Sequence, residues 1–178
     1  MMNTILVTNA SRAGSTTGVA EAIAQTLENC GFDVDLQIMQ DIQDLSGYSA
    51  VVAGSAIRFD KWLPEAMQFI ERHQEALSQK PFAAFLVCLA MAVQDEQKRE
   101  KAIIAASNYL NPVRTLVPTV SEGLFAGVLD LSKLPPVYRI PFSFLTIPGI
   151  FKEGDYRDWD AIHQWAKELS PELMPERA

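Results

Sequence analysis

Short apolar runs alternate with longer amphipathic stretches along most of the chain. The first run, residues 4–8, is apolar and rich in β-branched side chains, which predicts a strand buried on both faces of a parallel sheet. Further strand-like runs follow at residues 34–39, 50–54, 82–91 and 114–128. The run at 82–91 is nearly all apolar and predicts the central strand, whereas Pro118 places the last run at a sheet edge.

Helical spacing of apolar residues separates these runs. The first stripe ends at Gly31, a typical helix stop, and its members are Val19, Ala20, Ile23, Ala24 and Leu27. A second helix has Pro64 in its first turn, where the missing N–H costs nothing. Asp95 is expected to cap a third helix. The last helix is expected to open with residues 155–158, two of which are acidic, and to bury Trp159, Ile162, Ala166 and Leu169.

This alternation predicts an α/β fold, a doubly wound parallel sheet of five strands with helices on both faces. We expect residues 1–178 to form a single domain, because the length is close to that of one domain and no linker is evident. One irregular segment, residues 129–154, is longer than a compact domain usually carries. We treat this segment as an apolar insert before the last helix.

Composition and charge exclude several classes of protein. Hydrophobic residues make up 48% of the chain and charged residues 21%, which excludes a disordered protein. Lys and Arg number 15 against 22 for Asp and Glu, so the formal charge is −7. A chain of this sign disfavours nucleic acid as a partner and charge-driven binding to anionic membranes.

The cysteines, the N-terminal residues and the longest apolar stretch indicate the cellular compartment. Cys30 and Cys88 lie far apart in no ligand-like spacing, so both are expected to be reduced, packed thiols. The N-terminal residues lack the basic and apolar regions of a signal peptide. The most apolar stretch, residues 134–151, contains four prolines and predicts no spanning helix. We expect a cytoplasmic protein, with a peripheral position at the inner face of the membrane as the alternative.

The loop after the first strand carries the clearest chemical pattern. Hydroxyls and free backbone N–H groups at a helix N-terminus attract a phosphate, and the loop offers Ser11, Gly14, Ser15, Thr16 and Thr17. It lacks the lysine of a nucleoside triphosphate loop and the further glycines of a dinucleotide fingerprint. A monophosphate site remains, and the alternative is an ordinary hydroxylated helix start.

Other chemistries find no support in the sequence. A receiver domain of bacterial signalling needs acidic residues where this chain has Asn9, Ala10, Gly54 and Ser55. No grouping of Ser, Cys, His and Asp favours nucleophilic catalysis, and no spacing favours a metal site. Asp60 is expected to cap the helix that follows it.

With these loops assembled, the chain resembles the flavodoxin-like family over residues 5–169. Residues 8–16 look like the FMN-phosphate loop of flavodoxins. Residues 53–59 followed by Lys61 and Trp62, and the ending at 154–159, look like one branch of the family. That branch is the flavodoxin-type, menaquinone-dependent protoporphyrinogen oxidases.

The resemblance implies a strand order of 2-1-3-4-5 and FMN as the cofactor. The phosphate would be wrapped by Ser11, Arg12, Ala13, Gly14, Ser15 and Thr16. The ribityl chain and the isoalloxazine would be bordered by Ser55, Ala56, Ile57, Arg58 and Phe59. The other wall would include Leu89, Ala90 and Met91, and residues 122–127, with Gly123, would approach the ring edge. Trp62 is assigned either to flavin contact or to packing at its helix start.

The resemblance also implies an activity and partners. In the oxidase interpretation, a porphyrinogen substrate reduces FMN and a quinone takes up the electrons, with Arg12, Arg58 and Arg139 as candidate contacts for the propionates. In a second interpretation the chain is an electron carrier whose −7 charge suits a basic redox partner. A third is a flavin-free interaction module, suggested by Ala13 in the loop and by the aliphatic wall at 89–92.

The insert admits three interpretations. Residues 137–147 hold many large apolar side chains, which something must cover. They fold back on the sheet edge or the flavin site, form a homodimer contact, or face a membrane or a quinone.

Overall fold

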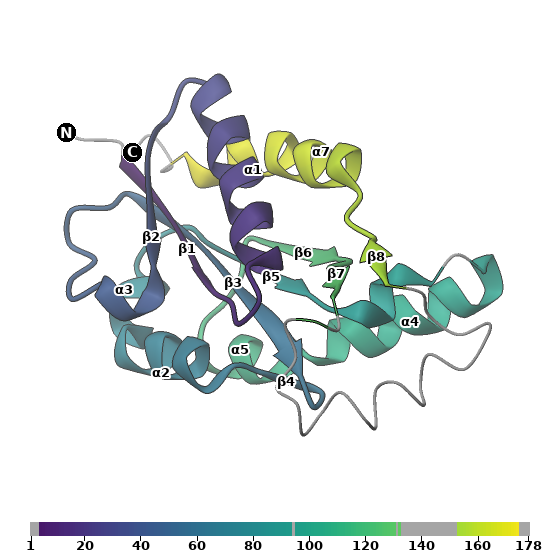
Figure 1. Cartoon of the computed structure of the whole chain (residues 1–178). Coiled ribbons are helices and arrows are strands. Elements are labelled where there is room, and N and C mark those ends of the chain that lie inside the picture. The colour runs from purple at the N-terminus through teal and green to yellow at the C-terminus, as the bar shows by residue number, and fades with distance from the viewer. Residues whose placement is uncertain (1–3, 94, 131, 133–152, 175–178) are drawn as a thin grey trace.

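In a computed structural model of the chain, five parallel strands form one sheet in the order β2-β1-β3-β5-β6 (Figure 1). The structure describes residues 4–93, 95–130, 132 and 153–174. The parallel strands are β1 (Thr4–Ala10), β2 (Asp33–Ile38), β3 (Ala50–Arg58), β5 (Phe82–Val87) and β6 (Ser121–Phe125). The order confirms the predicted 2-1-3-4-5 arrangement, with β5 and β6 as its fourth and fifth strands.

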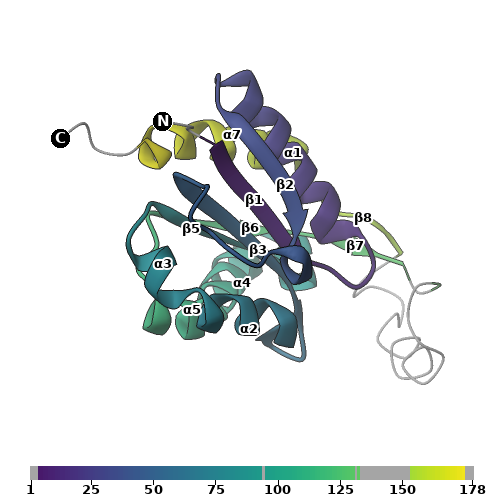
Figure 2. The same ribbon diagram turned by 90° about the vertical axis from the view of Figure 1, so that its left-hand side faces the viewer.

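Helices cover both faces of the sheet (Figure 2). One face carries α1 (Ser15–Asn29) and α7 (Trp159–Leu169), which contact each other. The other face carries α2 (Pro64–Arg72), α3 (Gln74–Ser78), α4 (Glu96–Asn108) and α5 (Asn111–Leu116). Three short 3₁₀ turns complete the described helices, η1 (Met39–Asp41), η2 (Leu89–Ala92) and η4 (Ser170–Leu173).

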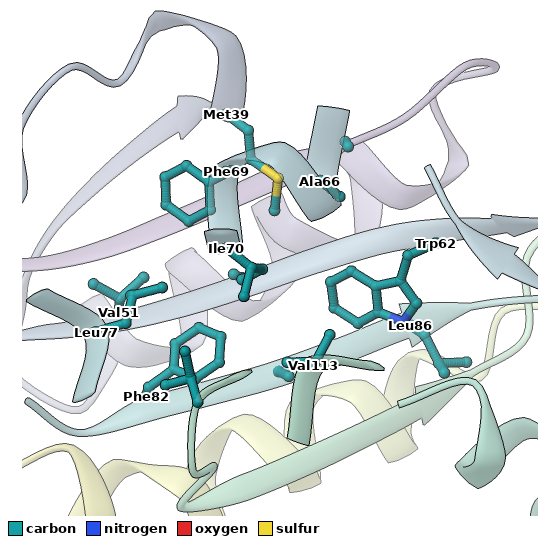
Figure 3. Packing of buried hydrophobic residues seen from close by; sticks show 14 of the residues in the cluster. Met39, Val51, Trp62, Ala66, Phe69, Ile70, Leu77, Phe82, Leu86 and Val113 are labelled. Atoms are coloured by element: carbon teal, nitrogen blue, oxygen red, sulfur yellow. The ribbon is translucent and has the colours of Figure 1, made fainter. Parts of the chain in front are cut away.

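Each face of the sheet has its own hydrophobic core, because successive strand residues point to opposite sides. On β1, Ile5 and Val7 pack toward α1, whereas Leu6 packs toward α2. Figure 3 shows the core on the α2 side, where Phe69 and Ile70 of α2 lie over the strand residues Val51 and Phe82. The α1 stripe predicted from the sequence is buried, which confirms that helix.

Three strand predictions are corrected. Residues 114–116 belong to α5 rather than to a strand, because Pro112 opens a short helix that buries Val113. The edge position of β6 is confirmed, but the central strand is β3 rather than β5. Strand β3 also continues past Gly54 to Arg58, because its end pairs antiparallel with β4 (Lys61–Trp62).

Two side chains predicted to be buried are exposed. Trp159 is 39% exposed, since it precedes the buried stripe of α7 and stacks under the Arg157 guanidinium, 4.4 Å from the ring centroid. Cys30 is exposed at the C-terminal end of α1, whereas Cys88 is buried as predicted. Both thiols are free. The predicted cap of α4 is confirmed, because the Asp95 carboxylate accepts the Lys98 N–H at 3.0 Å.

The ends of the insert lie side by side. Strand β7 (Val128–Leu129) pairs antiparallel with β8 (Gly154–Asp155) in a separate two-stranded sheet. Residues 131 and 133–152, which include the apolar run at 137–147, lie outside the described residues. A helix with the length and apolar character needed to cross a bilayer is not found in the described ranges.

Candidate functional site

A cavity of about 420 Å³ opens at the carboxyl ends of β1, β3 and β5, where doubly wound sheets bind ligands. Four segments surround it. Its lining residues are Ser11, Arg12, Ala13, Gly14, Ser15, Ala56, Ile57, Arg58, Phe59, Val87, Cys88, Leu89, Gly127, Val128, Leu129, Asp130, Asp155 and Arg157.

The first wall is the loop that connects β1 to α1. Gly14 caps the helix with φ of 86°, a left-handed conformation that glycine adopts without steric cost. The Ser11 hydroxyl accepts the Gly14 N–H at 3.0 Å, and this bond closes the loop. Behind it, the Thr17 hydroxyl donates to the Asn9 side chain at 3.0 Å. The loop therefore presents the first N–H groups of a fifteen-residue helix to the cavity.

One hydroxyl in this loop is left without a partner. The Thr16 side chain is fully buried, and its Oγ1 has no hydrogen-bond partner within the described part of the chain. A buried hydroxyl that lacks a partner costs free energy, so native proteins usually satisfy it. An acceptor bound at the start of α1 would supply what Thr16 lacks.

The second wall is a hairpin tip between β3 and β4. Arg58 pairs with Lys61, and the two residues between them, Phe59 and Asp60, have φ of 49° and 59°. Phe59 lies at the rim of the cavity and is 74% exposed. Asp60 accepts the Tyr109 hydroxyl at 2.6 Å, so the predicted helix cap is wrong. Leu63 takes the cap position of α2 because the chain turns back at Asp60 before the helix begins.

The third wall comes from the end of β5 and the turn that follows it. Val87, Cys88 and Leu89 face the cavity. Burial raises the pKa of the Cys88 thiol, which the N–H groups of Met91 and Ala90 offset only in part. Beside this wall, a Cβ added at Gly127 would lie 2.9 Å from the Val87 side chain. The glycine therefore keeps this side of the cavity open.

The fourth wall was missed by sequence reasoning. It is formed by the paired strands β7 and β8, with Asp155 and Arg157 at its end. Arg157 donates to the Asp155 carboxylate from its side chain at 2.9 and 2.5 Å and from its backbone at 3.0 Å. These bonds lower the pKa of Asp155 and hold the residue in β8 rather than in α7, where the sequence placed it. The two-residue strands carry no periodic pattern that would have revealed them.

The structure brings most of the predicted site residues to the cavity. Ten of the sixteen lie on its walls: Ser11, Arg12, Ala13, Gly14, Ser15, Ala56, Ile57, Arg58, Phe59 and Leu89. The other six are not among its lining residues: Thr16, Ser55, Trp62, Ala90, Met91 and Gly123.

Three of these six residues have a structural reason for lying outside the cavity lining. Ser55 is buried at the base of the hairpin, where its hydroxyl accepts the Leu63 N–H at 3.0 Å and donates to the Ala56 carbonyl at 2.8 Å. Trp62 packs in the α2-side core near Leu86, which agrees with the packing interpretation (Figure 3). Gly123 lies within β6, where a Cβ would meet the Phe125 ring at 2.6 Å.

Charges of both signs line the cavity. Arg12, Arg58 and Arg157 are among its lining residues, together with Asp130 and Asp155. Arg12 pairs with Glu65 at 2.9 Å, and Arg157 pairs with Asp155 at 2.5 Å. Arg139, the third predicted cation, lies outside the described residues. The site thus combines an N–H and hydroxyl loop, two largely apolar walls and charged groups of both signs. Within the described ranges, His, Cys, Asp and Glu form no group of three that could hold a metal ion.

Comparisons with known proteins identify the family of the chain. A family model described as "Flavodoxin domain" matches residues 6–147. No protein with a curated description matches the sequence.

Three flavodoxins are among the solved structures that share this architecture. A short-chain flavodoxin associated with a non-canonical PDU bacterial microcompartment is 15% identical, with a TM-score of 0.61 over 97% of this chain and 100% of that one. The Streptococcus pneumonia TIGR4 flavodoxin is 14% identical, with a TM-score of 0.58 over 96% and 99%. The Fusobacterium nucleatum flavodoxin bound to flavin mononucleotide is 12% identical, with a TM-score of 0.56 over 97% and 100%. At these identities the likeness shows the fold.

Proposed function

Because the chain belongs to the flavodoxin-domain family, we propose that it binds FMN in this cavity and carries electrons between redox partners. The observation that supports this most is the loop at the start of α1. There, the Thr16 hydroxyl is buried without a partner in the described chain beside free helix N–H groups. A phosphate monoester is an acceptor of the size and charge that these donors require.

The remaining walls suit the rest of an FMN molecule. The hairpin segment Ala56–Phe59 and the segment Val87–Leu89 border the cavity with mostly apolar side chains and backbone, a surface suited to a planar aromatic ring. Gly14 and Gly127 keep space that a side chain would fill. The residues present therefore fit FMN, with Ser11 to Thr16 on the phosphate and the two apolar walls on the ring.

FMN, when bound, supplies one- and two-electron chemistry, and the protein contributes position and electrostatics. Ala56, Ile57, Val87 and Leu89 would exclude water from a bound flavin, and the exposed Phe59 marks an edge of the cavity that is open to solvent. Partners that exchange electrons would dock at this open edge. The net charge of −7 favours partners with a basic docking surface.

The visible absorption spectrum of the purified protein tests this proposal. The protein is purified, desalted with and without added FMN, and titrated with FMN while flavin fluorescence is recorded. Retained flavin bands and a saturable binding curve support the cofactor, and a matched titration with riboflavin isolates the phosphate loop because riboflavin lacks the phosphate. A protein that retains no FMN after the addition refutes the proposal and favours the flavin-free module.

A second candidate is a quinone-dependent oxidase of protoporphyrinogen. The observation that favours it is Arg58 on the cavity lining, with Arg12 and Arg157, whose present partners are Glu65 and Asp155, since guanidinium groups bind carboxylates such as the propionates of a porphyrinogen. In this function the porphyrinogen is oxidised and a quinone is reduced at the same cavity. The flavin-loaded protein is incubated with protoporphyrinogen and a menaquinone analogue. Porphyrin fluorescence that grows no faster than with heat-killed protein excludes this candidate and leaves the electron carrier.

The insert is tested separately, as a homodimer contact or a membrane-facing surface. A variant lacking residues 137–147 is compared with the full chain by size-exclusion chromatography and by flotation with liposomes. Loss of dimer or of liposome binding identifies the role of the segment. Identical behaviour of the two proteins excludes both roles.

A further inference from the structure

The hairpin tip at the cavity rim adopts a conformation that its sequence does not favour. Phe59 and Asp60 both have positive φ, and neither is glycine. Two-residue hairpin turns of this kind usually contain Gly, Asn or Asp, and a phenylalanine in the left-handed region is unfavourable. Conformations of this kind persist when surrounding contacts hold them, and they cluster at ligand clamps.

A side-chain bond of Asp60 ties this tip to the body of the protein. The Tyr109 hydroxyl donates to the Asp60 carboxylate at 2.6 Å, across 49 residues of sequence. Tyr109 forms the C-terminal cap of α4, where its N–H bonds to the Ala106 carbonyl at 3.0 Å. Its ring packs against the α2-side core, and the next residue, Leu110, is fully buried. The bond thus joins an exposed turn to an anchored helix end.

The phenol remains a donor over the usual pH range. The bond to Asp60 and then burial raise the pKa of Tyr109 to about 12. Asp60 is one residue from Phe59 and two from Arg58, and both of these line the cavity. A displacement of Asp60 therefore moves the second wall of the site.

We propose that Tyr109 is a positioning residue, whose hydroxyl acts through Asp60 to hold the hairpin tip against the cavity and slow the release of FMN. This inference rests on the proposed function for its ligand. It concerns a residue outside the cavity lining. We call the Asp60–Tyr109 bond the latch.

Four variants separate the latch from the fold. Tyr109→Phe keeps the ring and removes the hydroxyl. Asp60→Gly removes the carboxylate but relieves the positive φ, so any loss it shows is not due to backbone strain. Asp60→Ala removes the carboxylate and adds strain. Asp60→Asn is the rescue variant, because its amide oxygen can still accept the phenol and asparagine tolerates this backbone region.

Limited proteolysis with trypsin tests the latch in the protein without bound cofactor. Arg58 and Lys61 flank the tip, and cleavage after them requires the hairpin to open locally. We expect cleavage at these two bonds to accelerate by about three- to tenfold in Tyr109→Phe and Asp60→Gly, the range expected for losing one hydrogen bond of typical net strength. Asp60→Asn should match the wild type. Cleavage at Lys98, in the first turn of α4, serves as the internal control.

Stopped-flow release of FMN then tests the positioning role. Tyr109→Phe and Asp60→Gly should release FMN about three- to tenfold faster, with a changed visible circular dichroism of the bound flavin, and Asp60→Asn should restore both. Unchanged proteolysis in Tyr109→Phe overturns the latch itself. Faster proteolysis with unchanged release overturns the positioning role. A wild-type protein that binds no FMN refutes the proposed function and the positioning role with it, while the proteolysis result still decides whether the latch exists.

Discussion

Two walls of the same cavity are built on opposite principles. The loop from Ser11 to Ser15 is closed by a bond between residues three apart, Ser11 and Gly14, and its left-handed residue is a glycine, although Arg12 also pairs with Glu65 of α2. The hairpin tip is held by a bond to a residue far along the chain, and its left-handed residues are Phe59 and Asp60. The first wall is therefore preorganised by its own sequence, whereas the second depends on the packing of α4.

This difference suits two different tasks. A phosphate needs fixed donors, because preorganisation reduces the entropy lost on binding. A redox cofactor that is loaded after folding also needs one wall that can open, and a strained turn that depends on a bond to a distant residue opens more easily than a closed loop. The predictions below test this contrast from the strongest expected effect to the weakest.

The strongest effect is expected for Gly14→Val. A β-branched residue at φ of 86° is disfavoured by at least about 1–2 kcal/mol, and the loop would have to rearrange. We expect lower stability in urea denaturation and a loss of FMN affinity of about tenfold or more. Gly47→Val is the control, because Gly47 also has open space around it but its φ lies outside the left-handed region. Equal behaviour of the two variants would contradict the preorganised loop.

A smaller effect is expected for Ser11→Ala. The substitution removes the acceptor of the Gly14 N–H and costs about 1 kcal/mol, which corresponds to about a fivefold weaker affinity for FMN. The affinity for riboflavin should change less, because riboflavin has no phosphate. Ser78→Ala removes a hydroxyl on α3 outside the cavity and should leave both affinities unchanged. A loss for riboflavin as large as that for FMN would show that Ser11 acts on the ring rather than on the phosphate.

Phe59→Asn is expected to raise the stability of the protein rather than to lower it. Asparagine tolerates the left-handed region, so the variant should be more stable by about 0.5–1 kcal/mol in urea denaturation. Little burial is lost, because Phe59 is 74% exposed. Phe59→Leu keeps the unfavourable backbone and should show no such gain. A destabilised Phe59→Asn would mean that contacts of the ring outweigh the backbone cost.

The weakest effect is expected in alkali. The pKa of Tyr109 rises to about 12 in the folded protein, above the ordinary value of about 10 that an unfolded tyrosine keeps. Its contribution to stability is therefore present below about pH 10 and is lost as the pH rises toward about 12.

Tyr48 provides the comparison outside the cavity, because burial and the bond to Asp35 raise its pKa to about 12 as well. Denaturation between pH 9 and pH 12 should show a shallower loss of stability in Tyr109→Phe than in the wild type. FMN release should accelerate over the same interval in the wild type and in Tyr48→Phe, and not in Tyr109→Phe. Equal pH dependence in all three proteins would contradict the role of the phenol.

The same contrast explains what could be predicted from the sequence. The sheet, the first helix and the first loop follow local patterns, and the cavity contains Ser11 to Ser15 as the sequence indicated. The extension of β3 to Arg58 could not be predicted, because it depends on pairing with Lys61 and on a turn without glycine. Asp60 was assigned to a helix cap for the same reason, since nothing near it in sequence identifies Tyr109 as its partner.

The fourth wall was missed because its strands are only two residues long. Val128 and Asp155 meet by backbone pairing between segments separated by the whole insert. No periodicity exists over such a length. The exposed Trp159 was likewise assigned to the core, because helical spacing alone does not show where the buried stripe of α7 begins.

The pairing of β7 with β8 has a consequence for how this protein could be altered. Since Leu129 pairs with Gly154, the two ends of the intervening stretch already lie side by side. Exchanging that stretch for another of different length costs little, because the entropy of closing a loop grows only slowly with its length. The paired strands β7 and β8 are thus a suitable place, next to the cavity, to insert another sequence. A new recognition element or a fused reporter could be inserted there without redesigning the sheet.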